Sequence, residues 1–206
     1  MLLFHQRLRA LAAVATLAFA ATPALAAPST DAAKSAQPTL FGIALNKAFD
    51  IAPCDSSVAG ALQTVCAKPR ASNLFDMAGE QSYEVVFRGA KQVPYLKYGS
   101  VIVSVREGVV KDVFAITNGA PVQTAVMADL AQHGTPAHDD KVDVSNAFGA
   151  RYTKTHAIWH LDGGAVEFDG IFQTLDVGTL EAVAYDELAM RNPPAEPVSQ
   201  AMNTRH

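Results

Sequence analysis

The segment Ser100–Ile116, SVIVSVREGVVKDVFAI, decides the fold class of this chain. Alternate positions in its first half carry valine, which places one apolar face on a strand formed by Val101, Val103 and Val105. Glu107–Gly108 then supplies a short turn, and the apolar run that follows it forms a second strand up to Ile116. The stretch therefore predicts a β-hairpin, whose two strands are antiparallel.

The rest of the chain adds four strands and one helix to this hairpin. Strands are predicted over residues 82–87, 153–161, 165–168 and 179–185, whereas the apolar run 40–45 is either a strand or a docking segment. Pro121 suits the first position of a helix, where its missing N–H is not needed, and Gly134 suits the end. The apolar stripe of this helix consists of Val122, Ala125, Val126 and Leu130.

The segment Pro53–Pro69, PCDSSVAGALQTVCAKP, contains both cysteines of the chain and admits two structures. Apolar residues from Val58 to Val65 have helical spacing, and an unbroken helix would hold the two cysteine Cα atoms about 18 Å apart at ~1.5 Å per residue. A disulfide requires roughly 4.4–6.8 Å. An oxidising compartment favours the disulfide between Cys54 and Cys66, with the helix shortened to about Ser57–Leu62.

We therefore expect an α+β fold with a mainly antiparallel sheet of about six strands and two short helices. The elements can be divided into two tandem units of one helix and three strands, residues 40–119 and 120–190, within a single domain of residues 40–190. Residues 27–39 and 191–206 are rich in proline and polar residues and lack apolar periodicity. This composition is typical of a disordered linker and a disordered tail.

The first 26 residues have the pattern of a secretory signal peptide. Arg7 and Arg9 precede a run of about a dozen apolar residues, and Ala24–Ala26 fits the small-x-small cleavage pattern. A transmembrane anchor needs about 20 apolar residues, whereas this run is broken at Pro23. We expect cleavage near Ala26, and a periplasmic or secreted mature protein without a membrane anchor.

The charge of the mature chain argues against two classes of partner. Residues 1–26 include two arginines and no acid, so 16 basic and 20 acidic residues become 14 and 20, a formal net charge of −6. Nucleic acids and anionic membranes attract basic surfaces, so neither is expected as a partner. About 180 residues suffice for a stable core, and no cofactor is expected.

The sequence lacks the motifs of the common catalytic classes. The G-x-S-x-G elbow, the H-E-x-x-H helix, the C-x-x-C pair and the glycine-rich phosphate loop are all missing. Glu167 and Asp169 share one face of a predicted strand, as glycosidase carboxylates could, but exposed faces of edge strands carry such acids routinely. No catalytic residue is assigned.

Histidines suggest metal binding at two places. In the stretch HAIWH, His156 and His160 share one face of a predicted strand but lie about 13 Å apart, too far for one ion, while Trp159 between them faces the core. A second, weak candidate set matches no known ligand spacing. Its members are His133, His138, Asp139 and Asp140.

The segment Phe87–Gly99, FRGAKQVPYLKYG, is a candidate for recognition because it combines tyrosines with cations in an acidic protein. In the alternative interpretation, Tyr95 and Leu96 pack on the sheet while the lysines extend to solvent. The candidate interaction residues are Arg88, Lys91, Tyr95, Leu96, Lys97 and Tyr98.

Several stretches together resemble a group of small proteobacterial periplasmic proteins without an assigned function. They are FGIAL at 41–45, Pro53–Cys54, HGTP at 133–136, NAFGA at 146–150, Trp159, and FDGIFQTLDVGTLEAVAYDE at 168–187. The organisation is also similar to BamE-like domains and to the tandem units of β-lactamase inhibitor proteins, over roughly Leu40–Leu188. This resemblance implies protein binding without catalysis, and it carries over no individual contact residue.

We therefore expect an exported module that binds or inhibits another periplasmic or envelope protein and is not an enzyme. A periplasmic hydrolase with an unrecognised site and a carrier of a small ligand or metal ion are the alternatives. A deep pocket with perturbed ionisable groups would favour the enzyme, and an exposed aromatic patch on a closed core would favour the binding module.

Overall fold

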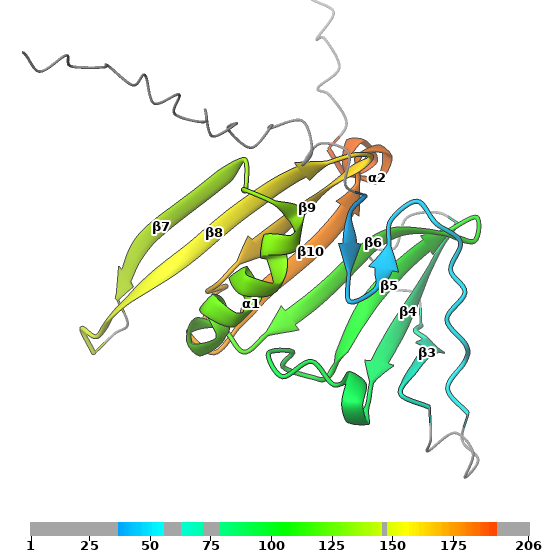
Figure 1. Ribbon diagram of the computed structural model, residues 1–206, viewed down its shortest axis with the longest axis horizontal. Helices are drawn as coiled ribbons and strands as arrows, with labels where there is room; N and C mark the ends of the chain where they lie inside the picture. Colours follow the sequence, from blue (N-terminus) through cyan, green and yellow to red (C-terminus); the bar gives the residue numbers. More distant parts are fainter. Residues whose placement is uncertain (1–36, 56–62, 72–78, 146–147, 193–206) are drawn as a thin grey trace, which may run out of the picture.

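A computed structural model describes residues 37–55, 63–71, 79–145 and 148–192, which are organised around one antiparallel sheet (Figure 1). Its eight strands follow the order β3-β4-β5-β6-β10-β9-β8-β7. Their bounds are β3 (Val65–Pro69), β4 (Glu80–Phe87), β5 (Ser100–Arg106), β6 (Val109–Thr117), β7 (His138–Ser145), β8 (Arg151–Leu161), β9 (Gly164–Asp169) and β10 (Gly178–Ala184). With two helices beside this sheet, the fold is α+β, as expected.

The sheet consists of two four-stranded meanders joined in the middle. Strands β3 to β6 form one meander and β7 to β10 form the other, and each strand pairs with the next strand in sequence. The last strands of the two meanders, β6 and β10, pair antiparallel over six residues, from Thr117 opposite Gly178 to Asp112 opposite Val183. The centre of the sheet therefore joins residues far apart in the sequence.

The predicted hairpin is confirmed as β5 and β6. Glu107 and Gly108 both have positive φ, 53° and 76°, which matches the right-handed twist of the two strands that they connect. The pairing shifts register after Ser104, so that Lys111 is an extra residue on β6. The predicted core valines of β5 are buried, including Val103 at 0% exposure.

One face of the sheet is covered by short elements. These are the hairpin β1 (Thr39–Leu40) and β2 (Ile43–Ala44), the helix α1 (Gln123–Leu130), and the short 3-10 helices η4 (Ala120–Val122) and η5 (Ala131–His133). Both the hairpin and α1 lie in front of the sheet in Figure 1. Leu40, Leu45, Val126 and Leu130 pack with the sheet residues in one core. We call this side the covered face.

Trp159 of β8 connects the sheet to the end of α1. Its side chain is 2% exposed, and its Nε1 donates a hydrogen bond of 3.0 Å to the carbonyl oxygen of Gly134, immediately after η5. His156 and His160 lie on the opposite side of β8, where they are partly buried and exposed, respectively. Both the core position of Trp159 and the end of the helical segment at Gly134 are confirmed.

The strand number and the make-up of the units differ from the expectation. The sheet has eight strands, and a separate two-stranded hairpin adds β1 and β2. The additional sheet strands are β3, whose Val65 continues a helical spacing, and β7, whose charged sequence indicates a loop. Each meander thus has four strands instead of three.

The helices differ as well. The structure ends in α2 (Tyr185–Arg191), which the sequence did not predict, and Arg191, expected in the tail, belongs to it. Ala125, counted in the apolar stripe of α1, is exposed. Thr39, expected in the disordered linker, belongs to β1. The predicted signal peptide at 1–26, linker residues 27–36, the short helix proposed at Ser57–Leu62 and the tail after Asn192 lie outside the described residues.

The two edges of the sheet have different structures. At the β3 edge, the segment before Cys54 runs alongside the strand: Cys54 N–H donates to the Ala67 carbonyl, and Ala67 N–H donates to the Ala52 carbonyl, both at 2.9 Å. A disulfide joins Cys54 to the fully buried Cys66, with Cα atoms 4.8 Å apart. This edge is therefore covered and covalently fixed, and the disulfide predicted from the sequence is present.

Removal of this disulfide is expected to lower the free energy of unfolding by about 3 kcal/mol, because the bridge closes a short loop and restricts the unfolded chain. The measurement is guanidinium denaturation of Cys54→Ala/Cys66→Ala, with the wild-type protein under reducing conditions as the control. Both should lose the same stability. A loss well under about 1 kcal/mol would show that the hydrogen bonds of the Ala52–Cys54 segment hold the edge without it.

Candidate functional site

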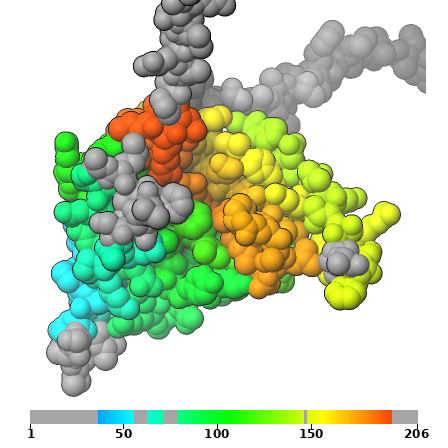
Figure 2. Space-filling view, turned by 180° about the vertical axis from the view of Figure 1, so that it is seen from behind, coloured from blue at the N-terminus to red at the C-terminus, as the bar shows by residue number. Residues whose placement is uncertain are grey.

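The second face of the sheet is open over much of its area. Because successive residues of a strand alternate between faces, the neighbours of the core residues point to this side. Figure 2 shows this open face with α2 at one end and the segment around residues 170–177 projecting from it. One row of side chains crosses the four central strands on this face, and each residue lies opposite the next. The row consists of Ile102 on β5, Phe114 on β6, Glu181 on β10 and Glu167 on β9. The open face is thus partly apolar and partly acidic.

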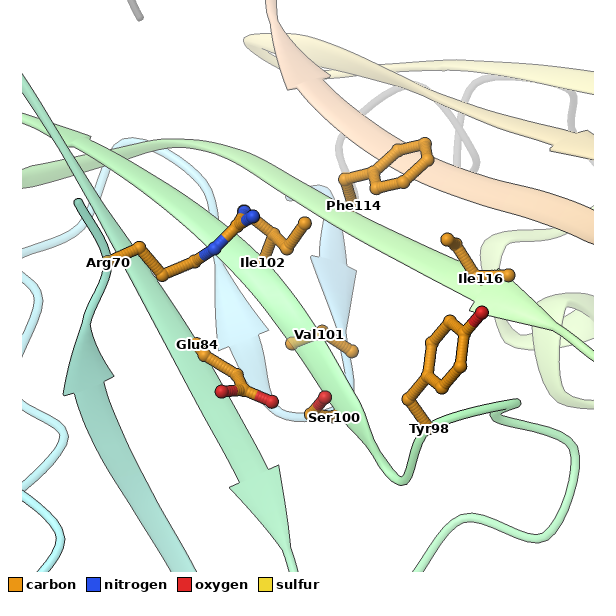
Figure 3. A pocket seen from close by; sticks show the side chains of 8 residues that line it. All are labelled: Arg70, Glu84, Tyr98, Ser100, Val101, Ile102, Phe114 and Ile116. Carbon is orange, nitrogen blue, oxygen red and sulfur yellow. The ribbon is translucent and has the colours of Figure 1, made fainter. Parts of the chain in front are cut away.

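A shallow hollow of about 330 Å³ lies on the open face over β4, β5 and β6. Besides the buried Val101, its apolar lining comes from Tyr98, Ile102, Phe114 and Ile116 (Figure 3). Tyr98 lies just before β5 and is 69% exposed, the others being half-buried. Large apolar groups are normally removed from water, so their presence at the surface is a feature of interaction sites.

Charged side chains border the apolar part of this hollow. Arg70 follows β3, and Glu84 lies on β4, so both approach from the side of the hollow opposite to Tyr98 (Figure 3). The backbone N–H of Arg70 donates to the carbonyl of Ser82 at 2.9 Å, which fixes the position of its Cα next to β4. We call the hollow and its two charged neighbours the central hollow.

The structure separates the six candidate interaction residues into different environments. Tyr95 and Leu96 are 7% and 5% exposed and belong to the core. The Tyr95 hydroxyl donates a hydrogen bond of 2.8 Å to Asp129 of α1. Burial and the neighbouring Asp129 carboxylate raise the pKa of Tyr95 above its usual range. Tyr95 therefore ties α1 to the segment before β5, and Leu96 fills the core.

Lys97 fixes the loop beside the central hollow. Its Nζ lies 2.5 Å from the Asp176 carboxylate and donates at 2.9 Å to the Asp176 carbonyl. Hydrogen bonds from Lys97 and from Thr174 lower the pKa of Asp176 to about 2. On the other side of this loop, the Ala120 N–H donates to the Leu175 carbonyl at 2.8 Å. Gly119, the residue before Ala120, has a φ of 66°. A Cβ atom at this position would overlap the backbone of residues 175–177.

The remaining candidates lie on the connection between β4 and β5. Arg88 follows β4 directly, and Lys91 is the exposed last residue of the 3-10 helix η3 (Gly89–Lys91). Of the six residues, Tyr98 alone lines the central hollow. Which of them contact a partner stays a prediction.

The apolar residues on the open side of the hairpin, Ile102, Phe114 and Ile116, were not among the predicted interaction residues. A signal for them was present in part: β6 carries apolar residues on both faces from Val113 to Ile116, and β5 places Ile102 on the face opposite its valines. Since one face already fills the core, the second apolar face indicates an interaction surface.

The α2 end of the open face is held by ion pairs. Glu187 is fully buried and lies 2.8 Å from the guanidinium of Arg106 on β5. Arg191 lies 2.5 Å from Asp112 of β6 and 2.7 Å from Glu181 of β10. Burial and the nearby Glu181 raise the pKa of Asp112 to about 8, although Arg191 acts in the opposite direction. The network fixes α2 across the centre of the sheet.

A second hollow of about 420 Å³ lies between the loop that follows β9 and the β7–β8 hairpin. Its lining includes Val144 and Lys154 from the hairpin and Ile171 and Leu175 from the loop. Lys154 Nζ lies 2.8 Å from the Asp169 carboxylate, which ties the two sides together.

The weak metal candidates are separated by the fold. His133 is buried at the end of η5, where burial lowers its pKa. His138, Asp139 and Asp140 are exposed on β7, and His138 Nε2 lies 2.8 Å from Asp140. His156 also approaches His138, with ring centroids 5.9 Å apart. Among the residues with described coordinates, no group of three His, Cys, Asp or Glu side chains could hold a metal ion.

The geometry of the central hollow is suited to contact with another molecule through apolar burial, flanked by one cation and one carboxylate. Within the described ranges, no helix is long and apolar enough to cross a membrane. Comparison with protein-family models, with curated proteins and with solved structures finds no match for this chain.

Proposed function

We propose that this protein is an exported, periplasmic module that binds or inhibits another protein through the open face of its sheet, without catalysis. The observation that carries this proposal is the central hollow, where Tyr98, Ile102, Phe114 and Ile116 form an apolar surface. Burial of such a surface contributes roughly 25 cal/mol per Å² to association. Tyrosine and arginine at its border are the residue types most frequent in binding hot spots.

The shape of the hollow favours a protein partner over a small ligand. It is open toward solvent and extends over three neighbouring strands, whereas sites for small molecules enclose most of their ligand. A protein side chain inserted between Tyr98 and Phe114 would have the remaining open face as a surrounding contact area.

The disulfide supports the location in this proposal. Cystine bridges form and persist in oxidising compartments such as the periplasm, and Cys54–Cys66 is formed in the structure. The signal-peptide pattern of residues 1–26 points to the same compartment.

The test compares capture of proteins from a periplasmic extract by three forms of the mature chain. Tyr98→Ala removes an exposed ring of the central hollow, and Tyr185→Ala removes an exposed ring of α2 outside it. A partner captured by the wild type should be captured about tenfold less by Tyr98→Ala and equally well by Tyr185→Ala. A photo-crosslinking residue at position 98 should form a covalent adduct with the same protein.

Two outcomes would contradict the proposal. One is equal capture of each partner by wild type and Tyr98→Ala, which would exclude the central hollow as the contact. The other is no capture at micromolar bait together with turnover in a hydrolase substrate screen, which would favour the enzyme alternative.

A further inference from the structure

The edge strand β7 is long and regular, whereas the β3 edge is covered by the Ala52–Cys54 segment. It is eight residues long, and its register with β8 is unbroken from His138 to Ser145. Seven of its eight residues are exposed and Val144 is intermediate. It is the last strand of the sheet, so no other described strand pairs with its outer side. Figure 1 shows β7 at the margin of the molecule, away from α2.

A free edge of this kind can accept another strand through main-chain hydrogen bonds. Protein edges that avoid such pairing are commonly short, bulged or interrupted by proline, and β7 has none of these features. It does carry charges, and their positions determine which strand can be added.

The charges of β7 lie mainly on one face. Asp139, Lys141 and Asp143 lie on the covered face of the sheet. Their partners on β8 are on that face too: Ala157, Thr155 and Thr153. The residues of β7 on the open face are His138, Asp140, Val142 and Val144. An added strand therefore meets an acidic–basic–acidic series on one face and a more apolar series on the other.

We infer that the partner of this edge is β7 of a second copy of the chain, paired antiparallel about a two-fold axis at Val142. In this arrangement the two copies of β7 are neighbours in one continuous sheet, and the two-fold axis is perpendicular to that sheet. Each residue of one copy therefore lies opposite a residue of the other copy whose side chain points to the same face. In a symmetric register, one residue lies on the axis opposite its own copy. At least five residue pairs form when this residue is 140, 141, 142 or 143.

Charge selects one of these registers. Centring on Asp140, Lys141 or Asp143 places two identical charges directly opposite each other, which is unfavourable. Centring on Val142 places the two Val142 side chains opposite each other and Lys141 opposite Asp143 of the second copy, twice. Val142 is 52% exposed in the single chain and gains burial in this arrangement. The paired segment in this register is 139–145.

The resulting dimer has a sixteen-stranded sheet, twice the eight of one chain, with both open faces on the same side. The inference uses none of the residues of the central hollow, so it stands or falls independently of the proposed function.

The test is sedimentation velocity of the full mature chain from low micromolar to near-millimolar concentration. We expect the wild-type mass to shift from one chain to two. Lys141→Asp and Asp143→Lys should each raise the dimer Kd about tenfold, since each converts both ion pairs into like-charge pairs. An equimolar mixture of these two variants should dimerise again, because the introduced aspartate of one variant would face the introduced lysine of the other.

Three results would overturn the inference. The wild type could stay a single chain at every concentration, or the two single variants could dimerise as well as the wild type, or their mixture could fail to recover dimerisation. Glu107→Lys, which changes an exposed charge in the β5–β6 turn, is the matched control and should leave the Kd unchanged.

Discussion

Replacement of Trp159 by alanine is expected to lower the free energy of unfolding by about 3–5 kcal/mol. The indole is the largest side chain of the core, and only 2% of its surface is exposed. Its removal leaves a cavity between β8 and the end of α1, and it deletes the hydrogen bond to the Gly134 carbonyl. Since Gly134 connects α1 to β7, we expect the loss to loosen the covered face over the second meander.

The measurement is chemical denaturation followed by circular dichroism, because Trp159 is the one tryptophan of the chain and its fluorescence disappears in the variant. Trp159→Phe is the matched control: it keeps a buried ring but loses the N–H donor, and it should cost roughly half as much. If alanine costs under about 1 kcal/mol, the site collapses without a cavity and the role assigned to the indole is wrong.

Replacement of Arg106 by methionine is expected to cost about 3–5 kcal/mol, because it leaves the Glu187 carboxylate buried without its closest cation. Glu187 is 0% exposed, and its oxygen lies 2.8 Å from the Arg106 guanidinium. The second cation near Glu187 is Arg191, whose Nε is 3.4 Å away and which also pairs with Asp112 and Glu181. Arg191 therefore cannot replace Arg106 fully.

The double variant Arg106→Met/Glu187→Leu provides the control. Removing both members of a buried ion pair and filling the volume with apolar groups is often neutral, so the double variant should recover to within about 1.5 kcal/mol of the wild type. Denaturation curves of the single and double variants give both values. A double variant as unstable as Arg106→Met would show that the loss of stability does not come from an unpaired Glu187 carboxylate.

The hairpin of β5 and β6 could be predicted because its information is local. The alternation of Val101, Val103 and Val105 and the turn at Glu107–Gly108 lie within one short stretch. The same is true of the helical segment, where Pro121 begins and Gly134 ends the pattern. The disulfide was predictable for a different reason, since the expected oxidising compartment favours a bridge and two cysteines allow one pairing.

The elements that were missed depend on contacts that no local window contains. β3 keeps its place through β4 and the disulfide, although Val65 continues a helical spacing. β7 contributes almost nothing to the core, and its apolar alternation is limited to Val142 and Val144, which is too short to predict a strand. The seven residues of α2 are held by Arg106 and Asp112 from distant strands, and such a short helix is not stable in isolation.

The candidate site was predictable in part. Tyr98 could be identified from its aromatic and basic surroundings, whereas Tyr95 and Leu96, its close neighbours, are in the core. The direction in which these side chains point depends on the loop between β4 and β5, which has no regular period. Ile102, Phe114 and Ile116 could have been predicted, because they are apolar residues on the face of two predicted strands that the core does not use.

The junction of β6 with β10 has a consequence for the order of folding. Within each meander every pairing joins neighbouring strands, so both can form from short-range encounters, but Thr117 and Gly178 pair across the long intervening chain. Closing a loop of about 60 residues costs roughly 3–4 kcal/mol of chain entropy before the pairing can compensate. We expect this step to limit the folding rate, so substitutions at Phe114 or Leu180 should slow refolding, whereas those at the β7 edge should mainly affect unfolding.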